Sequence, residues 1–154
     1  MSVRVYEPGM REFWEQWRWH TDGMPFAVGL TVILLIVGLF QIALAAGAPW
    51  GRLAWGGAHE VLPAKLRIGS VVSVLIYAVI AVIAFARVGA SEALPPHVAV
   101  LAMWVVFGYF SLGILMNAIS RSRLERLVMT PTVIVLAVLS LLIALGFGSA
   151  ASPA

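Results

Sequence analysis

One glycine- and tryptophan-rich stretch brings an arginine, a histidine and a glutamate close together in the sequence. Residues 47–63 read GAPWGRLAWGGAHEVLP. Its candidate site residues are Trp50, Arg52, Trp55, His59 and Glu60. A guanidinium with an acid–base pair could bind an anionic headgroup or move a proton, and the tryptophans could roof the site or stack on Arg52. The alternative interpretation is a compact interfacial cap without chemistry.

His59 and Glu60 do not by themselves predict a metal site. Adjacent residues on a helix point about 100° apart, so these two side chains need not converge. Zinc sites use three or four ligands, and the chain has no cysteine. We therefore expect no metal and no cofactor.

A second cluster of charge lies between residues 120 and 130, where three arginines flank a glutamate. Arg121 and Glu125 are neighbours if a helix continues through them. The candidate residues are Asn117, Arg121, Glu125 and Arg126. Each arginine close to an anionic leaflet contributes roughly 1 kcal/mol of binding, so the pattern predicts a lipid-headgroup anchor. A site for a partner protein or an anionic ligand is the alternative.

The composition sets the environment of both segments. The chain has 154 residues, of which 62% are hydrophobic and 11% charged, and its mean hydropathy is +0.99. Soluble domains are roughly 45–50% apolar and about 25% charged. Soluble, disordered and collagen-like proteins are therefore excluded. The net charge of +3 favours anionic lipid headgroups as partners and gives no indication of nucleic-acid binding.

The uncharged runs predict an all-α membrane protein, with a four-transmembrane-helix bundle forming a single membrane domain over residues 1–154. A helix needs about 20 apolar residues to cross roughly 30 Å of hydrocarbon. The predicted spans are 25–46, 68–87, 98–119 and 130–147. Thr130 and Pro131 are interpreted as the start of the last span. The Trp/Gly-rich loop occupies residues 47–66, and we expect residues 148–154 to form a flexible tail.

An amphipathic helix is predicted at residues 8–20, before the first span. Phe13, Trp14 and Trp17 fall on one helical face and form an expected interfacial anchor in the headgroup layer. The alternative is a docking helix for a partner protein.

Four spans place the Trp/Gly-rich loop and residues 120–130 on the same side of the membrane. That side carries Arg52, Lys65, Arg67, Arg121, Arg123 and Arg126, against Arg4, Arg11, Arg18 and Arg87 on the other. The positive-inside rule therefore predicts both segments in the cytoplasm and the termini outside. We also expect the two segments to fold together into one polar cap, with Glu60 or Glu125 pairing with an arginine.

The segments GAPWGRLAWGGAHEVLPAKLR and NAISRSRLERLVMTP resemble a group of small four-helix bacterial integral membrane proteins. That group shares a GAPWG…WGG…LP..LR stretch and a later N..SRS..ER segment, and the resemblance covers roughly residues 35–147. The shared residues are Gly47, Pro49, Trp50, Gly51, Trp55, Gly56, Gly57, Pro63, Arg67, Asn117, Ser120, Arg121, Ser122, Glu125 and Arg126. The resemblance implies a fold and a bacterial inner or plasma membrane, but no activity.

Three hypotheses about function are compatible with these features. No charged residue falls within an apolar interior, which argues against a proton-coupled exporter. Gln41, the one amide well inside a span edge, is interpreted as a helix–helix contact. The first hypothesis is a non-enzymatic accessory or scaffold subunit with a protein partner or a second copy of itself. The alternatives are binding or movement of a lipid or small apolar molecule, with a crevice beside Gly108, and an enzyme acting on a lipid headgroup at residues 47–66.

Overall fold

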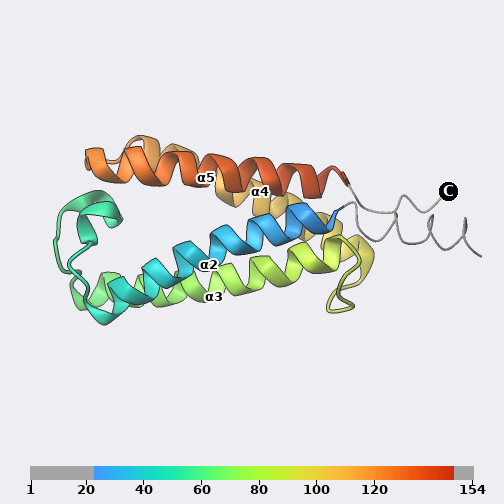
Figure 1. Cartoon of the computed structure of the whole chain (residues 1–154), viewed down its shortest axis with the longest axis horizontal. Helices are drawn as coiled ribbons and strands as arrows, with labels where there is room; N and C mark the ends of the chain where they lie inside the picture. The colour runs from blue at the N-terminus through green and yellow to red at the C-terminus, as the bar shows by residue number, and fades with distance from the viewer. Residues whose placement is uncertain (1–22, 148–154) are drawn as a thin grey trace, which may run out of the picture.

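The computed structural model describes residues 23–147, which form four long helices (Figure 1). These are α2 (Met24–Ala46), α3 (Ala64–Arg87), α4 (Pro96–Ala118) and α5 (Arg123–Ala144), with the short 3₁₀ turns η1 (Gly51–Leu53) and η2 (Trp55–Gly57) between α2 and α3. Each of the four helices is long and apolar enough to cross a membrane, and no strand occurs within 23–147. The predicted all-helical fold with four such helices is therefore confirmed.

The predicted amphipathic helix at 8–20, with Phe13, Trp14 and Trp17, lies outside the described residues. The tail at 148–154 does as well.

Proline and glycine mark most helix ends. Pro25 lies in the first turn of α2, where a missing N–H costs no intrahelical bond. Gly47 ends α2 in the left-handed conformation, with φ of 98°. Pro63 precedes α3, and Pro95 precedes α4. These breaks are local, so the sequence predicts the bounds of α2 and the start of α4 closely.

Helix α5 begins at Arg123, not at Thr130 as the sequence analysis placed it. Ser122 is the N-cap, and its hydroxyl oxygen accepts a hydrogen bond of 3.3 Å from the backbone N–H of Glu125. The serine satisfies an N–H that has no partner within the helix, so the helix starts there. Pro131 consequently lies inside α5, where it removes a single backbone bond. Helix α3 also starts earlier than predicted, at Ala64, which places Lys65 and Arg67 in its first two turns.

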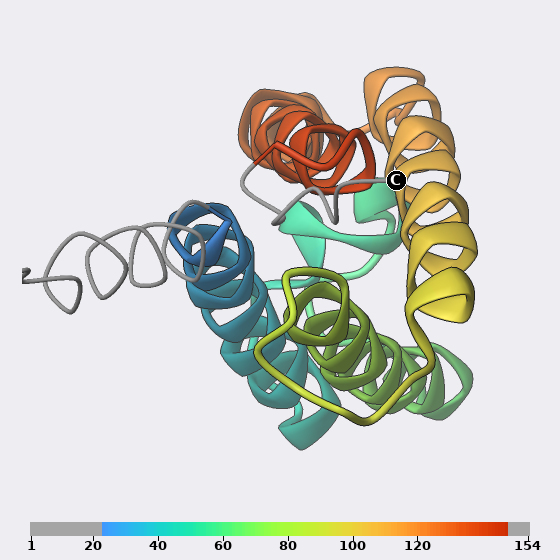
Figure 2. The ribbon, with the colours of Figure 1, turned by 90° about the vertical axis from the view of Figure 1, so that its right-hand side faces the viewer.

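The four helices form a ring of antiparallel neighbours. α2 packs most extensively on α3, and α4 on α5, while α2–α5 and α3–α4 contacts close the ring. The α2–α3 pair and the α4–α5 pair diverge toward the end where α2 leads into α3 (Figure 1). Seen along the bundle, the Trp/Gly-rich loop lies at that end, between the helices (Figure 2).

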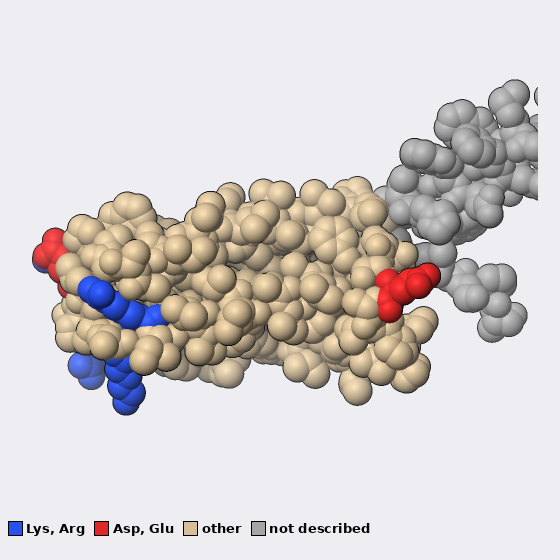
Figure 3. Space-filling view, turned by 90° about the horizontal axis from the view of Figure 1, so that it is seen from below, with Lys and Arg blue, Asp and Glu red and all other residues tan. Residues whose placement is uncertain are grey.

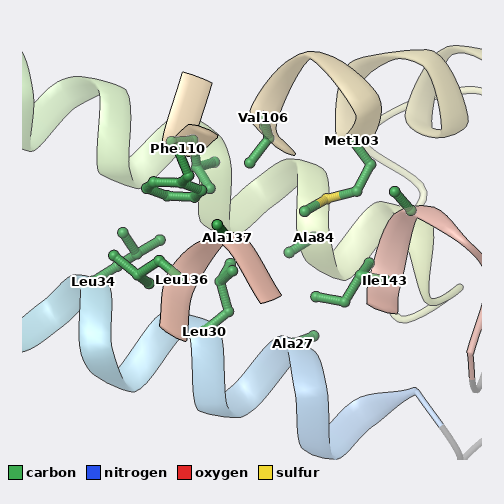
Figure 4. Close-up of a cluster of buried hydrophobic side chains, with 12 residues drawn as sticks. Ala27, Leu30, Leu34, Ala84, Met103, Val106, Phe110, Leu136, Ala137 and Ile143 are labelled. Carbon is green, nitrogen blue, oxygen red and sulfur yellow. The ribbon is translucent and has the colours of Figure 1, made fainter. Parts of the chain in front are cut away.

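The main apolar core fills the opposite part of the bundle, toward the ends of the described chain (Figure 4). Leu30, Met103 and Ile143 point toward one another from α2, α4 and α5 and are essentially inaccessible to solvent. Ala84 and Ala137 let α3 and α5 approach this centre closely. One part of the bundle is therefore tightly packed.

Charge is confined to the two ends of the described molecule. Figure 3 shows a broad uncharged belt between blue and red groups at the loop end and red groups at the other. At the loop end lie Arg52, Glu60, Lys65, Arg67, Arg121, Arg123, Glu125 and Arg126, and at the opposite end lie Arg87 and Glu92. Many large apolar side chains of the belt are exposed, as expected for a surface that contacts lipid.

Candidate functional site

The Trp/Gly-rich loop, which in the structure spans residues 47–63 before α3 begins, folds back on itself. The backbone N–H of Gly51 donates to the carbonyl oxygen of Glu60 at 2.9 Å, which closes the loop. A Cβ on Gly51 would overlap that returning backbone, so the position requires glycine. Ala54 and Leu62 are buried with Leu44 of α2 in a small second core.

The loop is tied to the start of α5 through Glu125. This carboxylate is only 7% exposed, and its Oε2 accepts hydrogen bonds from the backbone N–H of Gly56, at 3.0 Å, and from the hydroxyl of Ser120. The Ser122 hydroxyl donates to the carbonyl oxygen of Arg52 at 2.6 Å. Gly57 packs so closely on Ser122 that a Cβ there would collide with it. The two segments thus form one polar cap, and their predicted association is confirmed.

Trp55 ties the same loop to α3. Its indole N–H donates to the hydroxyl oxygen of Ser70 at 3.2 Å, and its ring lies so close to Gly69 that no side chain would fit there. Arg67 adds a third tie, because its Nε donates to the carbonyl oxygen of Leu62 at 2.9 Å. The cap therefore bridges the two helix pairs at the end where they diverge.

The polar side chains of the loop are only partly brought together. Arg52 pairs with Glu60 at 3.8 Å, the one ion pair found within residues 23–147, and both side chains are about two-thirds exposed. Exposed pairs of this kind contribute little to stability. Trp50 stacks on Phe40 with an interplanar angle of 4°, not on Arg52. His59 is exposed.

A cavity of about 660 Å³ lies beneath the cap and between all four helices. Its walls are mostly apolar and include Phe40, Phe110, Met116 and Leu136. The cavity extends from the cap at Glu125 to Leu136 on α5, which is about 16 Å along the helix axis. It thus occupies the part of the bundle that the main core leaves unfilled.

The structure sorts the predicted site residues into two groups. Trp55, Asn117, Arg121 and Glu125 line the cavity. Trp50, Arg52, His59, Glu60 and Arg126 do not. The cavity is lined by Tyr109, the neighbour of Gly108, and by Gly113 further along α4, but not by Gly108 itself. An acid–base group that combines Glu125 with His59 is therefore not assembled in this cavity.

The cavity also groups three polar residues that the sequence did not connect, namely Gln41, Tyr77 and Tyr109. They come from α2, α3 and α4, and the Gln41 amide lies next to the Tyr77 hydroxyl. As an isolated amide in an apolar run, Gln41 is predicted from the sequence to be a helix–helix contact. No local pattern connects it with the two tyrosines, because they meet only through tertiary packing.

Within the part of the chain that the structure describes, no three histidine, cysteine or acidic residues gather as a metal site would require. Comparisons with family models, curated proteins and solved structures found no match for this chain.

Proposed function

We propose that this chain is a non-enzymatic integral membrane protein that binds a lipid or another small, mainly apolar molecule in the cavity beneath its cap. The cavity itself carries the proposal. Its volume is within the range of roughly 300–1,000 Å³ that is typical of small-molecule sites, and its apolar walls hold a few polar groups, which is the usual composition of such sites.

The arrangement of packing supports binding over a purely structural role. A bundle that only served as a scaffold would gain stability by filling its interior, because each unfilled volume forfeits dispersion contacts. Here the cap spans the diverging helix pairs without filling the space between them. A ligand would supply the missing contacts.

The proposal includes an orientation in a bacterial inner membrane, with the cap in the cytoplasm. Within residues 23–147, six lysine and arginine residues lie at the cap end (Arg52, Lys65, Arg67, Arg121, Arg123 and Arg126), and Arg87 lies at the other. Such asymmetry in short loops favours a cytoplasmic position for the more positive side. Exposed Arg121 at the cavity wall would meet anionic headgroups there.

The experiment is purification in a mild detergent followed by native mass spectrometry and lipid extraction. We expect a discrete adduct on the wild-type protein. Val37→Trp should abolish it by filling the cavity, since Val37 is a lining residue. Val79→Trp is the matched control, because Val79 is exposed on the outer face of α3 and does not line the cavity.

An adduct retained equally by both variants would contradict the proposal. A stoichiometric protein partner without any adduct would instead favour the accessory or scaffold role.

A further inference from the structure

Gln41 differs from most hydroxyl and amide side chains of the long helices. Six hydroxyl or amide side chains donate back to a carbonyl of their own helix, at 2.7–3.0 Å: Thr31, Ser73, Ser111, Asn117, Thr132 and Ser140. Such bonds satisfy a polar group locally. The Oε1 of Gln41 is instead buried without a hydrogen-bond partner, and the whole residue is only 8% exposed.

An unpaired buried acceptor is costly, so its position is informative. Leaving it desolvated destabilises the folded state, and native structures contain few such groups. Arg87 Nε and Thr130 Oγ1 also lack a partner, but neither residue lines the cavity. Gln41 does line it, beside Tyr77, and Tyr109 lines the same cavity.

The surroundings of Gln41 are uncharged. The charged lining residues, Arg121 and Glu125, belong to the cap, and Glu125 already accepts two hydrogen bonds there. Gln41 lies five residues before the end of α2 at Ala46, about 8 Å further into the bundle along the helix axis. A charged ligand group at that depth would be desolvated without a counter-ion, which is far more costly than burying a hydroxyl.

We propose that Gln41 accepts a hydrogen bond from the hydroxyl of an uncharged single-chain amphiphile, whose hydrocarbon chain lies along the apolar walls of the cavity. This inference rests on the proposed function and names its ligand class. A free long-chain alcohol and a monoacylglycerol share the required chemistry. The volume of about 660 Å³ suits one chain, not a complete two-chain phospholipid.

Trp55 provides the readout, because it lines the same cavity. Quenching of tryptophan fluorescence is measured in detergent micelles with four brominated probes of equal chain length: hexadecanol, its methyl ether, monopalmitoylglycerol and palmitate. The signal that disappears in Trp55→Phe reports occupancy of the cavity. The methyl ether retains an acceptor oxygen but has no donor, so it isolates the bond to Gln41 in the unmodified protein.

We expect the alcohol to bind about tenfold more tightly than the ether, and Gln41→Leu to remove this difference while leaving ether binding unchanged. Of the two hydroxyl probes, the tighter one identifies the source, a free alcohol or a glyceride. Equal binding of alcohol and ether to the wild-type protein would refute the role of Gln41 but not the cavity. Tightest binding of palmitate would refute the uncharged class. Failure of all four probes would contradict the inference and the proposed function together.

Discussion

Individual glycines in the Trp/Gly-rich loop determine how the cap can form. Gly56 and Gly57 both have positive φ, of 81° and 67°, which disfavours any residue with a side chain. They differ in their surroundings, because a Cβ on Gly56 would meet nothing within 4 Å, whereas a Cβ on Gly57 would collide with Ser122. Substitutions at these two glycines therefore separate the effect of backbone strain from the effect of close packing against α5.

The substitution Gly57→Ala should destabilise the protein more than Gly56→Ala. We expect Gly56→Ala to cost about 1 kcal/mol from the left-handed backbone alone. Gly57→Ala adds an overpacking cost of roughly 1–3 kcal/mol against Ser122. Thermal unfolding of the two variants in the same detergent measures the difference. Equal melting temperatures would mean that the close contact between the loop and α5 is absent.

At the scale of elements, the first turn of α5 is the main anchor of the cap. Ser122 and Glu125 serve their own helix, as N-cap and as an acid in the first turn, and both also bind the Trp/Gly-rich loop. The helix end and the loop contact thus depend on the same side chains. This double use explains why α5 starts well before the apolar run from which the sequence analysis predicted it.

Replacing Glu125 with alanine should release the loop from α5. The N–H of Gly56 and the hydroxyl of Ser120 lose their shared acceptor, so we expect amide exchange across 51–57 to become at least about tenfold faster. Hydrogen–deuterium exchange with mass spectrometry tests this. Arg126→Ala is the control, because Arg126 is exposed on the same helix and should leave the exchange unchanged. Unaltered protection in Glu125→Ala would show that other contacts hold the loop.

On the scale of the whole molecule, the bundle combines a packed part with a hollow part. Leu30, Met103 and Ile143 join the helices in the packed part, while the cap separates the cavity from the end of the bundle in the other. This division leaves room for a ligand beneath the cap, while the packed part holds the helices together. Charge is distributed as unevenly as packing, because most charged residues of the described chain lie at the cap end.

The orientation can be tested on the intact molecule, because the chain has no cysteine of its own. Single cysteines are placed at Ala58 in the cap and at Ala90 at the opposite end, both of which are exposed. We expect a membrane-impermeant maleimide to label only Ala90→Cys in intact bacterial cells expressing the variants, and both variants after permeabilisation. Selective labelling of Ala58→Cys would reverse the proposed orientation.

The sequence predicted the broad fold correctly for a physical reason. A backbone in hydrocarbon must satisfy its own hydrogen bonds, so a long uncharged apolar run has helix as its main solution. The association of the two polar segments also followed, because an even number of spans separates them. The start of α5 did not follow from the sequence. Ser122 and the pair Thr130–Pro131 are both typical helix starts, and only the hydrogen bond that Ser122 accepts in the structure decides between them.

The site required the tertiary structure. In helices that face lipid on one side and a core on the other, apolar residues occupy every face, so periodicity does not show which side chains point inward. Gln41, Tyr77 and Tyr109 come from three helices and meet through the rotation and divergence of those helices. Composition alone thus determined four apolar helices with charged ends, whereas packing alone determined that one end would be hollow and which polar groups would face the hollow.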